Sequence, residues 1–147
     1  MSNPQILTIA EVREYVSDFA PNNYLLAGEE FTDTYMSLCM TLAVDLYNTM
    51  SPKTSYDIGN FLSKNLLLQG TLWKMYEGKA ALLARNTMTY SDGGLQIPIE
   101  ERSQLYLGLA MNYKANFEAQ AQALKVNQNM NCGWGTVSSD QATFPWW

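Results

Sequence analysis

Apolar residues recur at intervals of three and four along most of the chain, the spacing that collects them on one face of an α-helix. Thr8 and Glu11 have the spacing of a capping box at a helix start, and Leu7 and Val12 are placed to form the accompanying hydrophobic staple. The pattern predicts a helix over about 9–19 that ends before Pro21. Its predicted buried residues are Val12, Tyr15, Val16 and Phe19.

A second helix is predicted over about 29–50, after a connector at 22–28. Glu29, Glu30 and Asp33 stand at its amino end, where negative charge suits the helix dipole. The spacing assigns to its core face Phe31, Tyr35, Leu38, Cys39, Leu42, Leu46 and Met50.

The third predicted helix covers about 56–86, and its middle turns are apolar on nearly all sides. A helix of this kind is buried on more than one face. Gly70 and Gly78 each cost about 1 kcal/mol relative to alanine inside a helix, so they are expected to mark a kink or a close approach of the backbone. A break at Gly70 into two helices is the alternative.

A fourth helix is predicted from Pro98 to about Asn127, a length of about 45 Å at 1.5 Å per residue. Glu100 and Glu101 lie in its first turn, where the helix dipole explains them better than acid–base chemistry does. Its last turns are expected to project from the bundle. Its predicted core residues are Leu105, Leu109, Tyr113, Phe117, Ala121 and Leu124.

Residues 87–98 interrupt the helical pattern with apolar residues at a period of two around a glycine-containing turn, which predicts a β-hairpin. The predicted pairs are Met88 with Ile97 and Tyr90 with Leu95. Ser91, Asp92, Gly93 and Gly94 form the turn between them. Two strands alone are marginal in water, so this hairpin must rest on the helices or on another chain.

The pattern as a whole predicts an all-α protein, a bundle of about four helices with a small β-hairpin between the last two. The helical domain is expected to span 1–130, and an extended arm to span 131–147. The arm has no helical period, yet three of the four tryptophans of the chain lie in its last 14 residues. Its large aromatic residues are Trp134, Phe144, Trp146 and Trp147.

Composition restricts the classes of partner. The 147 residues include 16% charged residues, well below the usual quarter, and 20 asparagines and glutamines, so the surface is expected to be neutral and amide-rich. Uncharged polar surface is cheaper to bury against another protein than charged surface is. The net charge is −5 and the nine basic residues are scattered, which disfavours binding to nucleic acid. No signal peptide or membrane-spanning segment is expected, and the compartment predicted for synthesis is cytoplasmic.

The sequence lacks the parts of common catalytic sites. It contains no histidine, which removes the usual nucleophile–base systems and the commonest transition-metal ligand. Cys39 is expected to be a core thiol, and Cys132 has no neighbouring cation to stabilise a thiolate. We therefore expect that the protein is not an enzyme and that it binds neither a cofactor nor a metal ion.

The aromatic arm requires a surface, because large apolar groups do not remain in water without one. It docks either on a neighbouring protein, as interface anchors do, or on its own bundle as a lid. The hairpin has the same two alternatives. The predicted partner-binding residues are Met88, Tyr90, Asp92, Gly93, Gly94, Leu95, Ile97, Trp134, Phe144, Pro145, Trp146 and Trp147.

The order of these elements resembles that of the head-to-tail connector proteins of tailed bacteriophages, also called adaptor or neck proteins. The resemblance rests on a capped short helix, two long helices, the segment T-Y-S-D-G-G-L-Q-I-P before another long helix, and an extended tail that contains W-G. It covers most of the chain.

The resemblance implies a structural virion protein located in the neck of the particle, whose copies form a homo-oligomeric ring of about twelve subunits. Its implied partners are the portal protein above and tail or further neck proteins below, and DNA would pass through the ring without specific binding. The hairpin would offer strand edges and the arm would offer anchors to these partners. The alternative is a small phage-encoded helical regulator or adaptor that binds a host protein through its aromatic tail.

Overall fold

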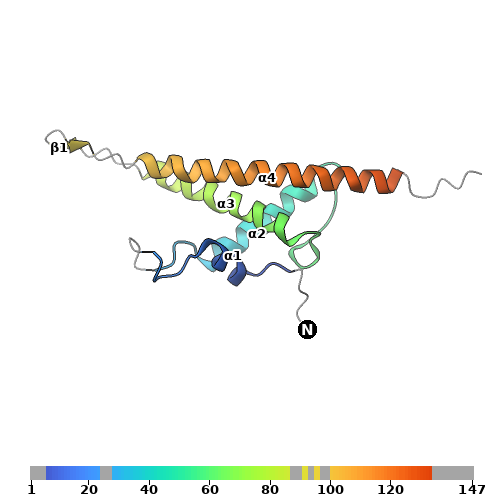
Figure 1. The fold of residues 1–147 in the computed structure, drawn as a ribbon, viewed down its shortest axis with the longest axis horizontal. Helices are drawn as coiled ribbons and strands as arrows, with labels where there is room; N and C mark the ends of the chain where they lie inside the picture. The colour runs from blue at the N-terminus through green and yellow to red at the C-terminus, as the bar shows by residue number, and fades with distance from the viewer. Residues whose placement is uncertain (1–5, 24–27, 87–90, 93–94, 97–99, 134–147) are drawn as a thin grey trace, which may run out of the picture.

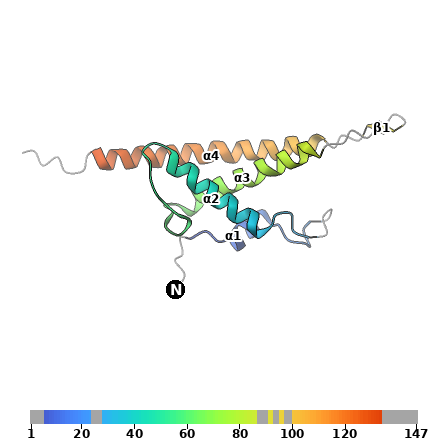
Figure 2. The same ribbon diagram turned by 180° about the vertical axis from the view of Figure 1, so that it is seen from behind.

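A computed structural model describes residues 6–23, 28–86, 91–92, 95–96 and 100–133. Within these ranges the chain forms four α-helices, one short 3-10 helix and one pair of two-residue strands. The helix α4 runs the length of the molecule beside α3, α2 crosses α3, and α1 covers the side away from α4 (Figures 1 and 2). The described residues are therefore mostly helical, which confirms the predicted all-α class with about four helices.

Helix α1 (Ile9–Val16) begins as predicted, since the Thr8 side chain accepts from the Glu11 N–H and Glu11 in turn accepts from the Thr8 backbone. It ends three residues earlier than predicted, because Ser17 adopts a left-handed conformation with φ of 55°. Val12 is buried as expected, whereas Tyr15 is 54% exposed, which corrects its predicted place in the core.

Helix α2 (Asp33–Thr49) begins four residues later than predicted, with Thr32 as its N-cap. Cys39 lies on the buried face as expected, but Leu38 and Leu42 are exposed. Two apolar stripes run along this helix, and the one that packs inward consists of Met36, Cys39, Met40, Ala43, Val44 and Tyr47. The spacing alone could not distinguish them, because both stripes repeat at three and four residues.

The third predicted helix is shorter than expected. A 3-10 helix, η1 (Ile58–Asn60), precedes it, and α3 (Lys64–Arg85) begins at the N-cap Ser63. The side chain of Asn48 holds the connecting segment in place, since it donates to the Tyr56 carbonyl at 2.8 Å and accepts from the Tyr56 N–H at 3.0 Å. Helix α3 continues through Gly70, so the alternative of a break there is wrong.

Both glycines of α3 mark close approaches rather than kinks. A Cβ atom at Gly70 would lie 2.8 Å from the Cβ of Ala43 and 2.8 Å from the ring of Phe117, so three helices meet at this point. At Gly78 an added Cβ would collide with the hydroxyl of Tyr35, which donates to carbonyl groups of α3 one turn earlier. Glycine is required at Gly70 because no side chain fits there.

Helix α4 (Glu100–Gly133) has 34 residues and extends beyond the predicted end near Asn127. Phe117 and Ala121 are buried as expected, but Leu105 is 68% exposed and Leu109 is 42% exposed. A repeat of four residues drifts by about 40° per step around a helix of 3.6 residues per turn, which explains why the predicted stripe leaves the core toward the amino end. The inward positions there are instead those of Ala110 and Tyr106.

The carboxyl-terminal turns of α4 pack on the bundle rather than projecting from it. The amine of Lys125 is buried and donates to the Pro52 carbonyl at 2.7 Å and to the Thr54 hydroxyl at 2.8 Å. Gln128 contacts the hydroxyl of Tyr47. The prediction that the last turns of α4 project from the bundle is therefore wrong for the residues up to Gln128.

The strand pair consists of β1 (Ser91–Asp92) and β2 (Leu95–Gln96), which are antiparallel. Asp92 lies opposite Leu95, whereas the prediction placed Tyr90 there, so the predicted register is wrong. The longer hairpin over 87–98 is not seen among the described residues, since each strand has two residues.

Packing at Gly70 gives the first prediction. Gly70→Ala should lower the free energy of unfolding by about 1 to 2 kcal/mol, because the cost of overpacking exceeds the gain in helix propensity. Gly108→Ala is the matched control, since an added Cβ meets nothing within 4 Å there, and it should raise stability by about 0.5 to 1 kcal/mol. Urea unfolding followed by circular dichroism measures both, and a Gly70→Ala chain as stable as the control would contradict the packing.

Candidate partner-binding surfaces

Most of the predicted partner-binding residues lie outside the described residues. Among them, Asp92 and Leu95 are placed in the strand pair by their backbone. The remaining ones lie outside the described ranges and are Met88, Tyr90, Gly93, Gly94, Ile97, Trp134, Phe144, Pro145, Trp146 and Trp147.

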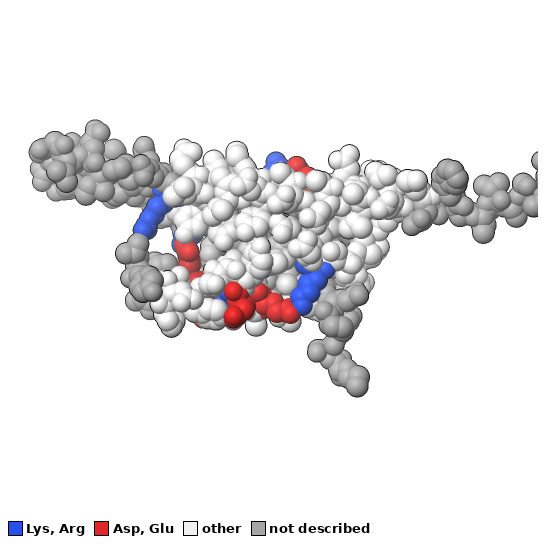
Figure 3. Space-filling model, in the orientation of Figure 1, with Lys and Arg blue, Asp and Glu red and all other residues white. Residues whose placement is uncertain are grey.

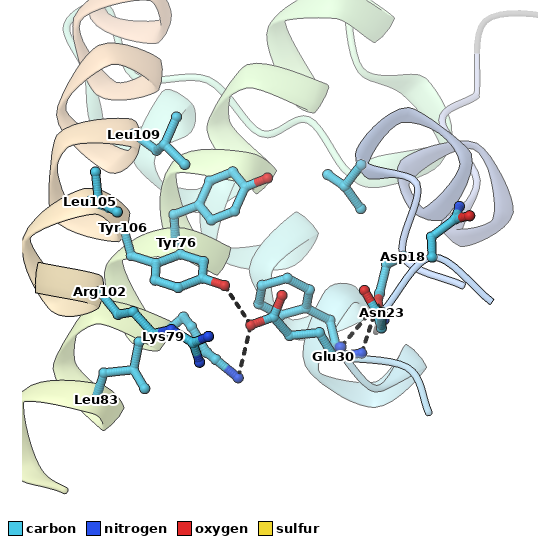
Figure 4. A pocket seen from close by; sticks show the side chains of 13 residues that line it. Asp18, Asn23, Glu30, Tyr76, Lys79, Leu83, Arg102, Leu105, Tyr106 and Leu109 are labelled. Carbon is cyan, nitrogen blue, oxygen red and sulfur yellow. Dashed lines mark hydrogen bonds and ion pairs between the residues drawn. The ribbon is translucent and has the colours of Figure 1, made fainter. Parts of the chain in front are cut away.

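The described residues form a pocket of about 650 Å³ at the amino end of α4. Its walls come from three places that are distant in sequence: the segment between α1 and α2, the last turns of α3, and the first turns of α4 (Figure 4). Leu105 and Leu109 contribute an apolar wall, and Phe31 and Tyr76 lie deeper. We call this hollow the α3–α4 pocket.

One polar network fixes the floor of the α3–α4 pocket. The Glu30 carboxylate accepts from the Tyr106 hydroxyl at 2.7 Å and pairs with the Lys79 amine at 3.1 Å (Figure 4). Burial, together with the hydrogen bond and charge of Glu30, raises the pKa of Tyr106 above its usual value. Tyr106 therefore stays protonated and acts as a donor, and the opposite charges of Glu30 and Lys79 neutralise each other.

A second, buried network shapes the pocket edge behind Glu30. Arg13 is 7% exposed, and its guanidinium pairs with Asp18 at 3.2 Å and with Asp33 at 2.6 Å. It also donates to the carbonyl of Phe31 at 3.0 Å. These contacts tie the end of α1 to the start of α2.

The Asp18 carboxylate accepts backbone hydrogen bonds from Glu30 at 2.7 Å and from Phe31 at 2.9 Å. Burial of the carboxyl alone would raise its pKa, but these two N–H groups, the amide of Asn23 and the charge of Arg13 outweigh it. The net result is a pKa of Asp18 below its usual value. The Asp18 side chain must face residues 30 and 31 to accept these two hydrogen bonds, which is consistent with α1 ending before Asp18.

Both carboxylates that line the pocket, those of Asp18 and Glu30, already have partners. They are engaged by Lys79, Arg13 and backbone N–H groups, so neither is placed as a free base. The thiol of Cys39 lies elsewhere in the core, and burial raises its pKa to about 11. Within the described part of the chain no group of three metal-ligating side chains is positioned to hold an ion.

A second candidate surface is the outer face of α4. Between 104 and 130 its exposed residues carry no charge apart from Lys114 and Glu118, which pair with each other. Figure 3 shows this part of the molecule largely without charge. The exposed large apolar residues on this helix are Leu105, Leu107, Leu109, Met111, Val126 and Met130.

Sequence reasoning missed both surfaces because it assigned Leu105 and Leu109 to the core. Two signals were present in the sequence. One is the angular drift of a four-residue repeat, and the other is the absence of charge on the helix side opposite Phe117. The segment between α1 and α2 joins the pocket through long-range contacts that no local pattern encodes.

Searches against protein-family models, curated proteins and solved structures gave no match for this chain. None of the described helices is long and apolar enough to cross a membrane.

The Asp18 network gives a prediction for the effect of pH. Since the pKa of Asp18 is lower in the folded chain than its unfolded value near 3.9, its ionised form stabilises the fold above about pH 4, and this contribution is lost as pH falls further. Asp18→Asn should lower stability at pH 7 by about 2 to 3 kcal/mol and flatten the loss of stability below about pH 4.

The control for this prediction is Asp45→Asn, because Asp45 is exposed on α2. The stability of Asp45→Asn at pH 7 should be close to that of the parent chain, because the Asp45 side chain forms no ion pair with any described residue. Urea unfolding at a series of pH values measures the difference. Parallel pH profiles for Asp18→Asn and the parent would show that the Asp18 carboxylate contributes nothing specific to the fold.

Proposed function

We propose that this chain is a structural subunit of a ring in the neck of a tailed bacteriophage, where the ring joins the portal of the head to the tail. The observation that carries the proposal is the uncharged outer face of α4. At 1.5 Å per residue this helix is about 50 Å long, and its exposed residues include only one pair of charges between 104 and 130. A long, neutral helix face suits repeated burial against identical neighbours.

Small residues line the centre of this outer face and support close packing of a second helix. Gly108, Ala115 and Ala119 lie on the side of α4 opposite Phe117, and all three are exposed. Since interaxial distance depends on side-chain size at the contact, small residues let a neighbouring helix approach closely. Met111 and Met130 flank this line and supply apolar area. No ion would have to be desolvated along this line.

The remaining roles in the proposal follow the resemblance in element order. The segment of the strand pair would contact the portal or tail proteins by adding strands, and the aromatic arm would supply anchors. The net charge of −5 suits a subunit beside DNA that must pass without adhering. The competing proposal, a helical regulator that captures a host protein, predicts a chain that is absent from particles.

Quantitative mass spectrometry of gradient-purified particles tests the proposal directly. The copy number of this chain should be about one for each portal subunit, as expected for a ring stacked on the portal. Absence from particles would reject the ring role and favour the regulator. The same measurement on particles that carry variants links the result to α4.

A paired substitution tests the outer face of α4. Ala119→Lys combined with Val126→Lys should leave the circular dichroism of the chain unchanged, because both positions are exposed, and should remove the chain from particles. Ser37→Lys, at an exposed position of α2, is the matched control and should be incorporated normally. Normal incorporation of the α4 variant would show that this face is not a subunit contact.

A further inference from the structure

We propose that the α3–α4 pocket of one copy binds the aromatic arm of a second copy, with Phe144, Trp146 and Trp147 as the anchoring residues. This inference rests on the proposed ring, because it identifies one contact between neighbouring subunits. The pocket is lined by Leu105 and Leu109, whereas Ala119 and Val126 of the α4 face lie outside it, so each contact can be tested without the other.

The pocket and the arm are chemically complementary. A volume of about 650 Å³ lies within the range of sites that take large aromatic ligands. Leu105 and Leu109 leave apolar surface open to solvent at its wall, and an indole ring would cover it. The floor is neutral as a unit, since Glu30 and Lys79 pair with each other. Polar groups at the floor can also accept from an indole N–H.

Charge favours the same occupant. Residues 134–147 contain one charged side chain, that of Asp140, so little desolvation opposes their burial. Arg102 lines the pocket and forms no ion pair with any described side chain. A guanidinium of this kind can stack on an aromatic ring or pair with the carboxylate of Asp140.

The length of the arm favours a second copy over the same chain. Leu105 and Gly133 are separated along α4 by about 42 Å, at 1.5 Å per residue. From Gly133, full extension brings Phe144 no further than about 40 Å and Trp147 no further than about 50 Å. An arm in its own pocket would therefore have to run back along α4 almost fully extended, which carries a high entropic cost.

The two complementary parts also lie at opposite ends of the subunit. The pocket is at the amino end of α4, and the arm follows Gly133 at its carboxyl end in the sequence. These two ends of α4 lie at opposite ends of the molecule (Figure 1). Complementary parts on different surfaces produce a heterologous, head-to-tail contact, which closes into a ring when each step adds the right rotation. Insertion of the arm into the next subunit has this form.

Disulfide trapping in the full-length chain distinguishes the possibilities. Asn22→Cys places a thiol at an exposed position on the pocket edge, and Pro145→Cys places one in the arm without removing an aromatic anchor. Both are introduced with Cys132→Ser, and Cys39 is buried. Mixing one chain that carries Asn22→Cys with another that carries Pro145→Cys should give a covalent heterodimer on oxidation.

A single chain that carries both substitutions should give covalent multimers rather than a cross-linked monomer. The control pairs Pro145→Cys with Ser37→Cys on α2, which should cross-link at least about tenfold more slowly if the arm is held at the pocket. A cross-linked monomer from the doubly substituted chain would show that the arm covers its own pocket and would overturn the proposal. Equal trapping at Asn22→Cys and Ser37→Cys would also overturn it.

Leu105→Glu tests the wall of the pocket. Leu105 is exposed, so the variant should keep the helical circular dichroism of the parent while the yield of heterodimer falls by about tenfold or more. Leu38→Glu, at an exposed leucine of α2, is the control and should leave the yield unchanged. Unchanged trapping by Leu105→Glu would count against the pocket as the binding site.

Failure of this contact can be separated from failure of the ring proposal by counting the chain in particles. Leu105→Glu chains that enter particles at the parent level would leave the ring role intact and remove the arm contact. Efficient trapping between chains that are absent from particles would leave the contact intact and remove the neck role.

Discussion

The meeting of α2, α3 and α4 at Gly70 is the constraint on which the rest of the structure depends. The backbone of α3 lies so close to Ala43 and Phe117 that no side chain can separate them. Phe117 also packs against Trp73, with ring centroids 5.8 Å apart, and fixes the rotation of α4 about its own axis. That rotation turns Ala121 inward and leaves the leucines near the amino end of α4 facing the pocket. The position of one glycine thus determines which side of the longest helix remains exposed.

Local features of the fold could be predicted from sequence because they depend on neighbours in the chain. The capping box at Thr8, the burial of Cys39 and the close approach at Gly70 each follow from short-range chemistry or from a single unusual residue. The carboxyl end of α1 and the amino end of α2 could not be predicted, because Asp18 takes hydrogen bonds from residues more than ten positions away. Helix faces were ambiguous wherever two apolar stripes run in parallel, as at Leu38 in α2.

The candidate sites divide in the same way. The aromatic arm and the strand segment were recognised from composition and period, and most of their residues lie outside the described ranges. The α3–α4 pocket could not be found from sequence, since its walls are contributed by segments that meet only in the folded chain. The neutral face of α4 could have been found, because the absence of charge opposite Phe117 is visible once the helix is drawn with its true period. The prediction missed this face because it assumed a spacing of four residues between core positions of α4.

The pocket is built on two parts of the molecule that are held together by different forces. Helices α3 and α4, which form two of its walls, are held by the apolar core, whereas the described residues within 17–30 contribute nothing to that core and are held by the ion pairs and hydrogen bonds of Arg13 and Asp18. Segments with few apolar contacts open more often than the core in native-state hydrogen exchange. A ligand that contacts both the helices α3 and α4 and the segment after α1 would suppress the opening of that segment. The conformational entropy that the segment loses would weaken the binding of the ligand. Arg13 belongs to α1 and does not line the pocket, so it can influence how tightly the pocket binds without contacting the ligand.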